Sequence, residues 1–139
     1  MNKVLLDTDI YSEVLKAIDP TVAQNAATYR LQHGFLTLSV VTLMEIVRGY
    51  QRKRSARRLQ AFLHAVAWEE VLDFDRSAAE LAGRIAGELE YVGRPIGNAD
   101  SMIAAIALDH GLERATGNTA HFQHVQQLGY PLTLVNWRV

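Results

Sequence analysis

The segment KVLLDTDIYS (residues 3–12) decides the fold, because an apolar run changes into a helical pattern at a single acid. Residues 3–6 have the short, apolar character of a buried strand. From Thr8 onward, apolar residues recur at helical spacing as far as Ile18. Asp7 therefore stands at the junction between a strand and a helix.

The same alternation continues along the chain. Four more runs have strand character, at residues 35–38, 70–73, 113–116 and 132–135. Helical spacing predicts helices over residues 8–17, 22–31, 42–50, 57–66, 76–92 and 99–110. Since parallel strands need crossover connections, the alternation predicts helices on both faces of a parallel sheet. The expected fold class is α/β, a three-layer α/β/α sandwich around a central, mostly parallel five-stranded sheet.

The composition limits the class of protein. A chain of 139 residues can bury a self-supporting core, so we expect a single domain over residues 1–139. The absence of cysteine excludes disulfides, thiolate metal sites and thiol nucleophiles. No segment approaches the ~20 apolar residues that a membrane span requires. We expect a cytoplasmic protein that does not associate with a membrane.

The basic residues are concentrated in one place. A net charge of −1 argues against a protein that coats nucleic acid non-specifically. Yet six of the 14 lysines and arginines lie between Arg48 and Arg58. Such a run is most often a solvated helix end, and here it also predicts one basic edge.

Three acids stand where an α/β sheet places its ligands, beyond the carboxyl ends of the strands. Asp7 directly follows the first strand. Glu45, in SVVTLMEIVRG (residues 39–49), follows the second strand among apolar neighbours, where an unpaired carboxylate is costly. Asp100, in PIGNADSMIAA (residues 95–105), shares the apolar stripe of its helix. All three are candidate functional residues.

Each of these acids also has a structural interpretation. Asp7 can cap the helix that follows it. Thr42 and Glu45 match a capping box, in which the glutamate reaches back to the amide of the cap residue. Asp100 lies near a helix N-terminus, for which Asn98 is the expected N-cap.

A fourth element, ATGNTAHF (residues 115–122), follows the fourth strand. Thr116 and Asn118 can offer neutral oxygens, and His121 can offer a nitrogen. The alternative is a plain turn followed by a short helix capped by Thr119.

Convergence of these elements would create a cation site. Two carboxylates about 4 Å apart repel by ~4 kcal/mol at an effective dielectric constant of about 20, so converging acids need a cation or a shared proton. Oxygen ligands with room for water suit Mg²⁺ or Mn²⁺ better than zinc. Such an ion polarises a phosphoryl oxygen and activates water, which predicts phosphodiester hydrolysis.

Four segments in this order resemble the PIN-domain nucleases, and specifically the VapC toxins of type II toxin–antitoxin systems. They are LLDTDIYS (residues 5–12), SVVTLMEIVRG (39–49), GRPIGNADSMIAA (93–105) and ATGNTAHF (115–122). The resemblance implies a Mg²⁺- or Mn²⁺-dependent endoribonuclease that forms a homodimer and is neutralised by a VapB-type antitoxin. Its implied substrate is RNA, with tRNA as one candidate.

The resemblance also implies roles for individual residues. Asp7 and Asp100 would be the principal metal ligands, and Glu45 a ligand or an acid that orients water. Family members often carry a fourth acid in the last segment, where this chain has Asn118 and His121. This departure leaves a second metal ion open, and Asp9 is only a secondary candidate.

Four further residues are expected to line the substrate: Thr8, Arg48, Thr116 and Asn118. Arg48 begins the basic run one helical turn after Glu45, close enough to guide an RNA backbone. Contact with the antitoxin is the other interpretation of this run.

Two other classes of protein share part of this pattern. An aspartyl phosphatase of the haloacid-dehalogenase type would use Asp7 as nucleophile, but it needs a later lysine, and the chain has none after Lys53. A receiver-like signalling domain needs the same lysine and a phosphorylatable acid after the third strand, for which Asp75 is poorly placed. A PIN fold that only binds partners or metal stays open.

Overall fold

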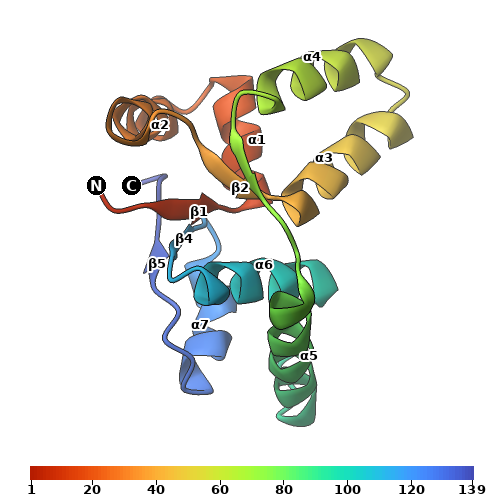
Figure 1. Ribbon diagram of the computed structural model, residues 1–139, viewed down its shortest axis with the longest axis vertical. Coiled ribbons are helices and arrows are strands. Elements are labelled where there is room, and N and C mark those ends of the chain that lie inside the picture. The colour runs from red at the N-terminus through yellow and green to blue at the C-terminus, as the bar shows by residue number, and fades with distance from the viewer.

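The computed structural model describes residues 1–139, and it has the predicted alternation of strands and helices (Figure 1). In chain order the elements are β1 (Val4–Leu6), α1 (Thr8–Lys16), α2 (Pro20–His33), β2 (Thr37–Ser39), α3 (Val40–Arg52), α4 (Ala56–Val66), β3 (Glu70–Leu72), α5 (Arg76–Tyr91), α6 (Asn98–Asp109), β4 (Glu113–Ala115), α7 (Thr119–Gln127) and β5 (Leu134–Val135). No helix combines the length and the apolar character needed to cross a membrane.

The strands are all paired in parallel, which confirms the predicted sheet type. Their hydrogen-bonded orders are β1-β4-β5 and β2-β3. The expectation of one five-stranded sheet is therefore only partly right, because the ladder is interrupted between β1 and β2 even though these strands are neighbours.

Tyr29 of α2 explains the interruption. Its hydroxyl lies 3.4 Å from the amide nitrogen of Val4 and 3.3 Å from the carbonyl oxygen of Val4, in β1. The same hydroxyl lies 2.8 Å from the hydroxyl of Thr37, in β2. A buried phenol thus satisfies backbone groups that a continuous ladder would pair strand to strand.

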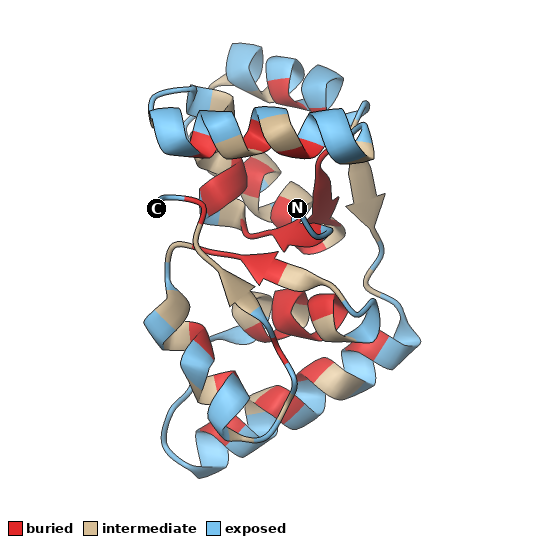
Figure 2. Ribbon diagram, turned by 90° about the vertical axis from the view of Figure 1, so that its left-hand side faces the viewer, coloured by how far each residue is buried: buried red, intermediate tan, exposed pale blue.

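The helices cover both faces of the strands, and β1 divides the core. Leu5 belongs to an apolar cluster built mainly from α5, α6 and α7. Val4 and Leu6 belong to a second cluster, built mainly from α1 to α4. Figure 2 shows the buried residues concentrated between the two sets of helices. This alternation along β1 is the layer arrangement that the sequence predicts.

The start of α6 differs from the prediction. Gly97, at φ 92°, is the N-cap, and Asn98 is the first helical residue. The left-handed backbone favours glycine there, so the helix begins one residue earlier than the Asn98 cap predicts.

The Tyr29 hydroxyl can be tested by Tyr29→Phe, which removes the oxygen and keeps the ring. Val4 would lose its buried partner, so we expect the free energy of unfolding to fall by about 1–3 kcal/mol in urea denaturation. Tyr130→Phe is the matched control, because that hydroxyl makes one long exposed contact of 3.5 Å to Glu88. A Tyr29→Phe protein as stable as the control would contradict the explanation.

Candidate active site

The three predicted acids lie at one edge of the sheet and form what we call the acid cluster: Asp7, Glu45 and Asp100. Asp7 follows β1, Glu45 lies in the second turn of α3, and Asp100 lies in the first turn of α6. Arg114 contacts both aspartates, and Thr8 donates a hydrogen bond to Glu45. Residues far apart in the sequence are thus connected in one network.

Asp7 is held more tightly than the other two acids. It is 5% exposed, and its Oδ1 accepts the Thr8 amide at 2.8 Å and Arg114 Nη2 at 3.1 Å. Its Oδ2 accepts the Thr116 hydroxyl at 2.9 Å. Asp7 therefore caps α1, which confirms its structural interpretation, and it also lies in the acid cluster, where its functional role stays a prediction.

Arg114, in β4, is the residue of this site that sequence reasoning missed. Its side chain is fully buried, with Nη2 3.4 Å from Asp100 Oδ1 and Nη1 donating to the Asp100 carbonyl oxygen at 3.0 Å. The guanidinium lies 3.5 Å above the centre of the Phe122 ring. An arginine inside a predicted parallel strand was the available signal, because arginine is almost never fully buried unless it is paired.

Asp100 is partly open to solvent. Burial raises its pKa above the ordinary value, although the nearby Arg114 charge lowers it; the negative charges of Asp7 and Glu45 raise it further. Its Oδ2 lies 3.8 Å from Nδ1 of His121. Burial is thus the main reason why the folded protein disfavours the ionised form of Asp100, and the charges of Asp7 and Glu45 add to it.

Glu45 does not form the predicted capping box. Ser39 is the N-cap of α3 and accepts the Thr42 amide at 3.2 Å, because the helix begins directly at the end of β2. Glu45 Oε1 instead accepts the Thr8 hydroxyl at 2.6 Å, and that hydroxyl lies 2.9 Å from the Thr42 hydroxyl. The Glu45 carboxylate therefore contacts Thr8, just after β1, and does not cap the N-terminus of α3.

The turn after β4 lies beside the acid cluster, and the predicted roles of Thr116 and Asn118 in lining the substrate stay predictions. The buried Thr116 hydroxyl donates to Asp7 and accepts the Asn118 amide at 3.0 Å. The Asn118 side-chain nitrogen lies 3.1 Å from Nδ1 of His121. Asn118, and not Thr119, is the N-cap of α7, and its side chain makes no capping bond.

Arg138, near the C-terminus, braces this turn. A Cβ on Gly117 would lie 1.6 Å from Arg138 Nη1, so the side chain passes directly over the glycine. Arg138 Nε donates to Glu13 of α1 at 2.7 Å. The glycine allows an ion pair to connect the turn, α1 and the C-terminal segment.

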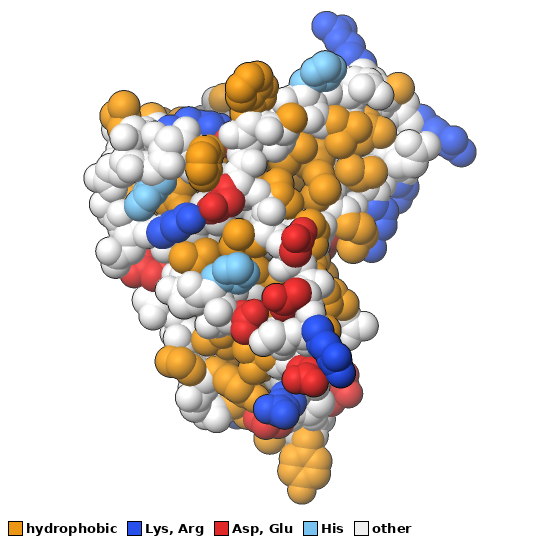
Figure 3. Space-filling model, in the orientation of Figure 1, with side chains coloured by type: hydrophobic (Ala, Val, Ile, Leu, Met, Phe, Trp, Pro, Cys, Tyr) orange, Lys and Arg blue, Asp and Glu red, His pale blue; other side chains and the backbone are white.

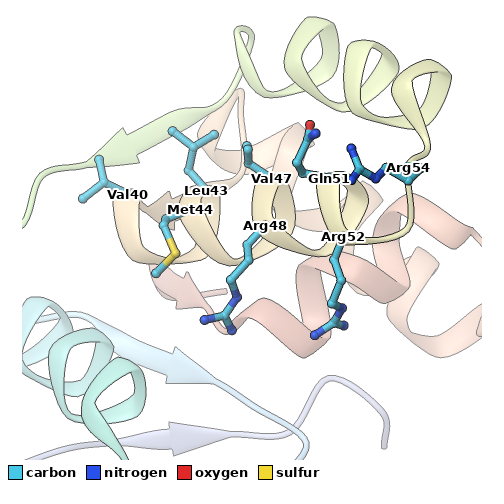
Figure 4. A pocket seen from close by; sticks show the side chains of 8 residues that line it. All are labelled: Val40, Leu43, Met44, Val47, Arg48, Gln51, Arg52 and Arg54. Atoms are coloured by element: carbon cyan, nitrogen blue, oxygen red, sulfur yellow. The ribbon is translucent and has the colours of Figure 1, made fainter.

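Arg48 does not join the acid cluster. It is exposed on α3 and makes no ion pair with the acids. Figure 4 shows it beside an open groove of about 890 Å³, lined by Val40, Leu43, Met44, Val47, Arg48, Gln51, Arg52 and Arg54. Its predicted role in lining the substrate stays a prediction.

Neutralising Asp100 and neutralising Asp7, each by substitution with asparagine, should have opposite effects on the stability of the protein. The raised pKa of Asp100 means that the folded state favours the protonated form, so stability falls as pH rises through that pKa. Asp100→Asn should therefore raise the melting temperature of the metal-free protein at neutral pH. Asp7→Asn should lower the free energy of unfolding by about 3 kcal/mol, because the buried Arg114 loses its closest counter-charge.

Thermal and urea denaturation at pH 7 with chelator would measure both effects. Equal destabilisation by the two substitutions would contradict the described electrostatics.

Comparison with known proteins agrees with this geometry. Residues 4–128 match the family described as the PIN domain. The chain is 36% identical over 126 residues to the tRNA(fMet)-specific endonuclease VapC of Shigella flexneri, covering 90% of this chain and 93% of that protein. The protein of the same name from Salmonella typhimurium is 31% identical over 126 residues, with the same coverage.

A solved structure shows the same likeness. The DNA-bound VapBC structure from Salmonella typhimurium superimposes with a TM-score of 0.81 at 29% identity, covering 99% of both chains. The fold, the family match and the sequence identity agree with one another. This chain belongs to the PIN-domain family, within its VapC group.

Proposed function

We propose that this protein is a divalent-metal-dependent endoribonuclease, acting as a single PIN-like domain over residues 1–139. The observation that carries the proposal is the acid cluster, which gathers three carboxylates at the carboxyl edge of β1. PIN-domain membership favours this activity over the aspartyl-phosphatase and receiver-like alternatives.

The donor atoms fit Mg²⁺ or Mn²⁺. Glu45 Oε2 and Asp100 Oδ2 accept no hydrogen bond, whereas Asp7 Oδ2 accepts one from Thr116 and would bind an ion through its second lone pair. In the structure, no three acidic or histidine side chains are arranged so that together they could hold a metal ion, so an ion here would depend on one or two carboxylates and on water. Mg²⁺ commonly keeps several waters and binds one or two carboxylates together with substrate phosphates, so an open site suits it.

The residues of the site have separable tasks. Asp7 and Asp100 would hold the ion, which polarises a phosphoryl oxygen and lowers the pKa of bound water. Glu45, held by the Thr8 hydroxyl, would orient the attacking water. Thr116 keeps Asp7 in position through its hydrogen bond. This division explains why two threonines accompany the acids.

RNA is the substrate that we propose, with tRNA as the class, because two relatives are named tRNA(fMet)-specific endonucleases. The basic run from Arg48 to Arg58 occupies the end of α3 and the start of α4. Figure 3 shows lysine and arginine side chains along the outer edge at this corner. Cations there would attract the phosphate backbone, which supports a path for RNA. The cytoplasm, where tRNA resides, is the proposed location.

A protein partner is part of the proposal. The superimposed Salmonella structure is a VapBC complex bound to DNA. We infer that a VapB-type antitoxin neutralises this protein and that the protein forms a homodimer.

The nuclease activity can be tested with purified protein and a tRNA pool. Cleavage should require Mg²⁺ or Mn²⁺ and stop with chelator. Asp100→Asn and Glu45→Gln should lower the cleavage rate by on the order of 100-fold or more, because several kcal/mol of transition-state stabilisation are lost.

Asp9→Asn is the matched control, since Asp9 is an exposed acid two residues from Asp7. It should cleave at the wild-type rate. Undiminished cleavage in chelator or by Asp100→Asn would refute the proposal.

A further inference from the structure

The acid cluster already contains one positive charge. Arg114 is fully buried, and a buried guanidinium is strongly destabilising unless a nearby negative charge compensates it. Its Nη2 atom lies 3.1 Å from Asp7 Oδ1 and 3.4 Å from Asp100 Oδ1. One nitrogen is therefore shared between the two aspartates that are the proposed metal ligands.

The guanidinium is enclosed and cannot easily leave this position. The ring of Phe122 covers one face of the guanidinium, with the central carbon 3.5 Å from the ring centre. This cation–π contact stabilises the positive charge. Nη1 is tied to the Asp100 carbonyl oxygen at 3.0 Å, and Nε is buried without a partner. With no exposed surface on the side chain, Arg114 is a permanent part of the site.

The charges then favour one metal ion. Three ionised carboxylates and one guanidinium leave two negative charges uncompensated, which is the charge that one divalent cation balances. A second divalent ion between Asp7 and Asp100 would meet the guanidinium at close range, and like charges so near repel strongly. The open side of the cluster, towards Glu45 and Asp100 Oδ2, is free of this cation.

We propose that Arg114 is a built-in cation of the acid cluster, which limits the site to a single divalent ion and keeps the metal-free protein folded. The proposal rests on the metal dependence proposed above, and it concerns how many ions the acid cluster of this chain binds. Arg114 acts through the two aspartates and is a positioning residue.

The test measures metal binding and stability, not activity. Isothermal titration calorimetry with Mn²⁺ should give one ion per wild-type chain. Arg114→Met should lower the melting temperature of the metal-free protein by on the order of 10 °C, because Asp7 and Asp100 lose the cation between them. Mn²⁺ should raise the melting temperature of this variant by more than it raises that of the wild type.

Two further variants separate this role from ordinary packing. Arg114→Lys keeps the positive charge. It should bind one Mn²⁺ ion per chain, and Mn²⁺ should raise its melting temperature only slightly. Arg138→Met removes the other arginine near the site, which pairs with Glu13. The number of Mn²⁺ ions bound per chain and the rise in melting temperature with Mn²⁺ should both equal the wild-type values.

The outcomes are distinct. Two Mn²⁺ ions per wild-type chain would overturn the role of Arg114. So would an Arg114→Met protein whose melting temperature Mn²⁺ raises only as much as that of the wild type. Either result would leave the metal-dependent function standing. No Mn²⁺ binding by the wild type would refute the proposed function as well. If Arg114→Met does not fold, the stoichiometries of the wild type and Arg114→Lys decide: one ion in each supports the proposal, and two in either overturns it.

Discussion

The buried ion pair between Arg114 and Asp7 is the interaction on which the site depends. Parallel pairing places Leu5 opposite Arg114 and Leu6 opposite Ala115, and the Asp7 amide donates to the Ala115 carbonyl at 2.9 Å. The ladder thus brings Asp7 to the end of β4, where the guanidinium and the Thr116 hydroxyl meet its two oxygens. Breaking a buried pair by removing one partner leaves an uncompensated charge, so this contact constrains both the strand register and the acids.

The electrostatics of the site oppose stability and favour ligand binding. Asp100 is held near two other negative charges, and its pKa is raised by burial and by those charges despite Arg114. A divalent cation beside Asp100 would favour its ionised form and offset the cost of burying that charge. A costly charge of this kind is typical of functional sites, where stability is given up for activity.

Local pattern predicted the elements, the parallel pairing and the three acids, because apolar periodicity and strand-end acids are visible in the sequence. Contacts between distant segments were not predictable. Tyr29, whose hydroxyl interrupts the sheet at Val4, is 25 residues away from Val4 in the sequence. Arg114 pairs with Asp7, which is 107 residues away in the sequence. The predicted capping box of Glu45 failed for a local reason, since Ser39 had already capped the helix.

The most direct test of the account is the position of a bound ion. Crystals of the wild-type protein grown with Mn²⁺ would be measured at a wavelength where manganese scatters anomalously. We expect one anomalous peak at the open side of the acid cluster, coordinated by oxygens of Asp7, Glu45 or Asp100. A saturated crystal with no peak there, or with its only peak at another surface, would contradict the central claim that these carboxylates form the metal site.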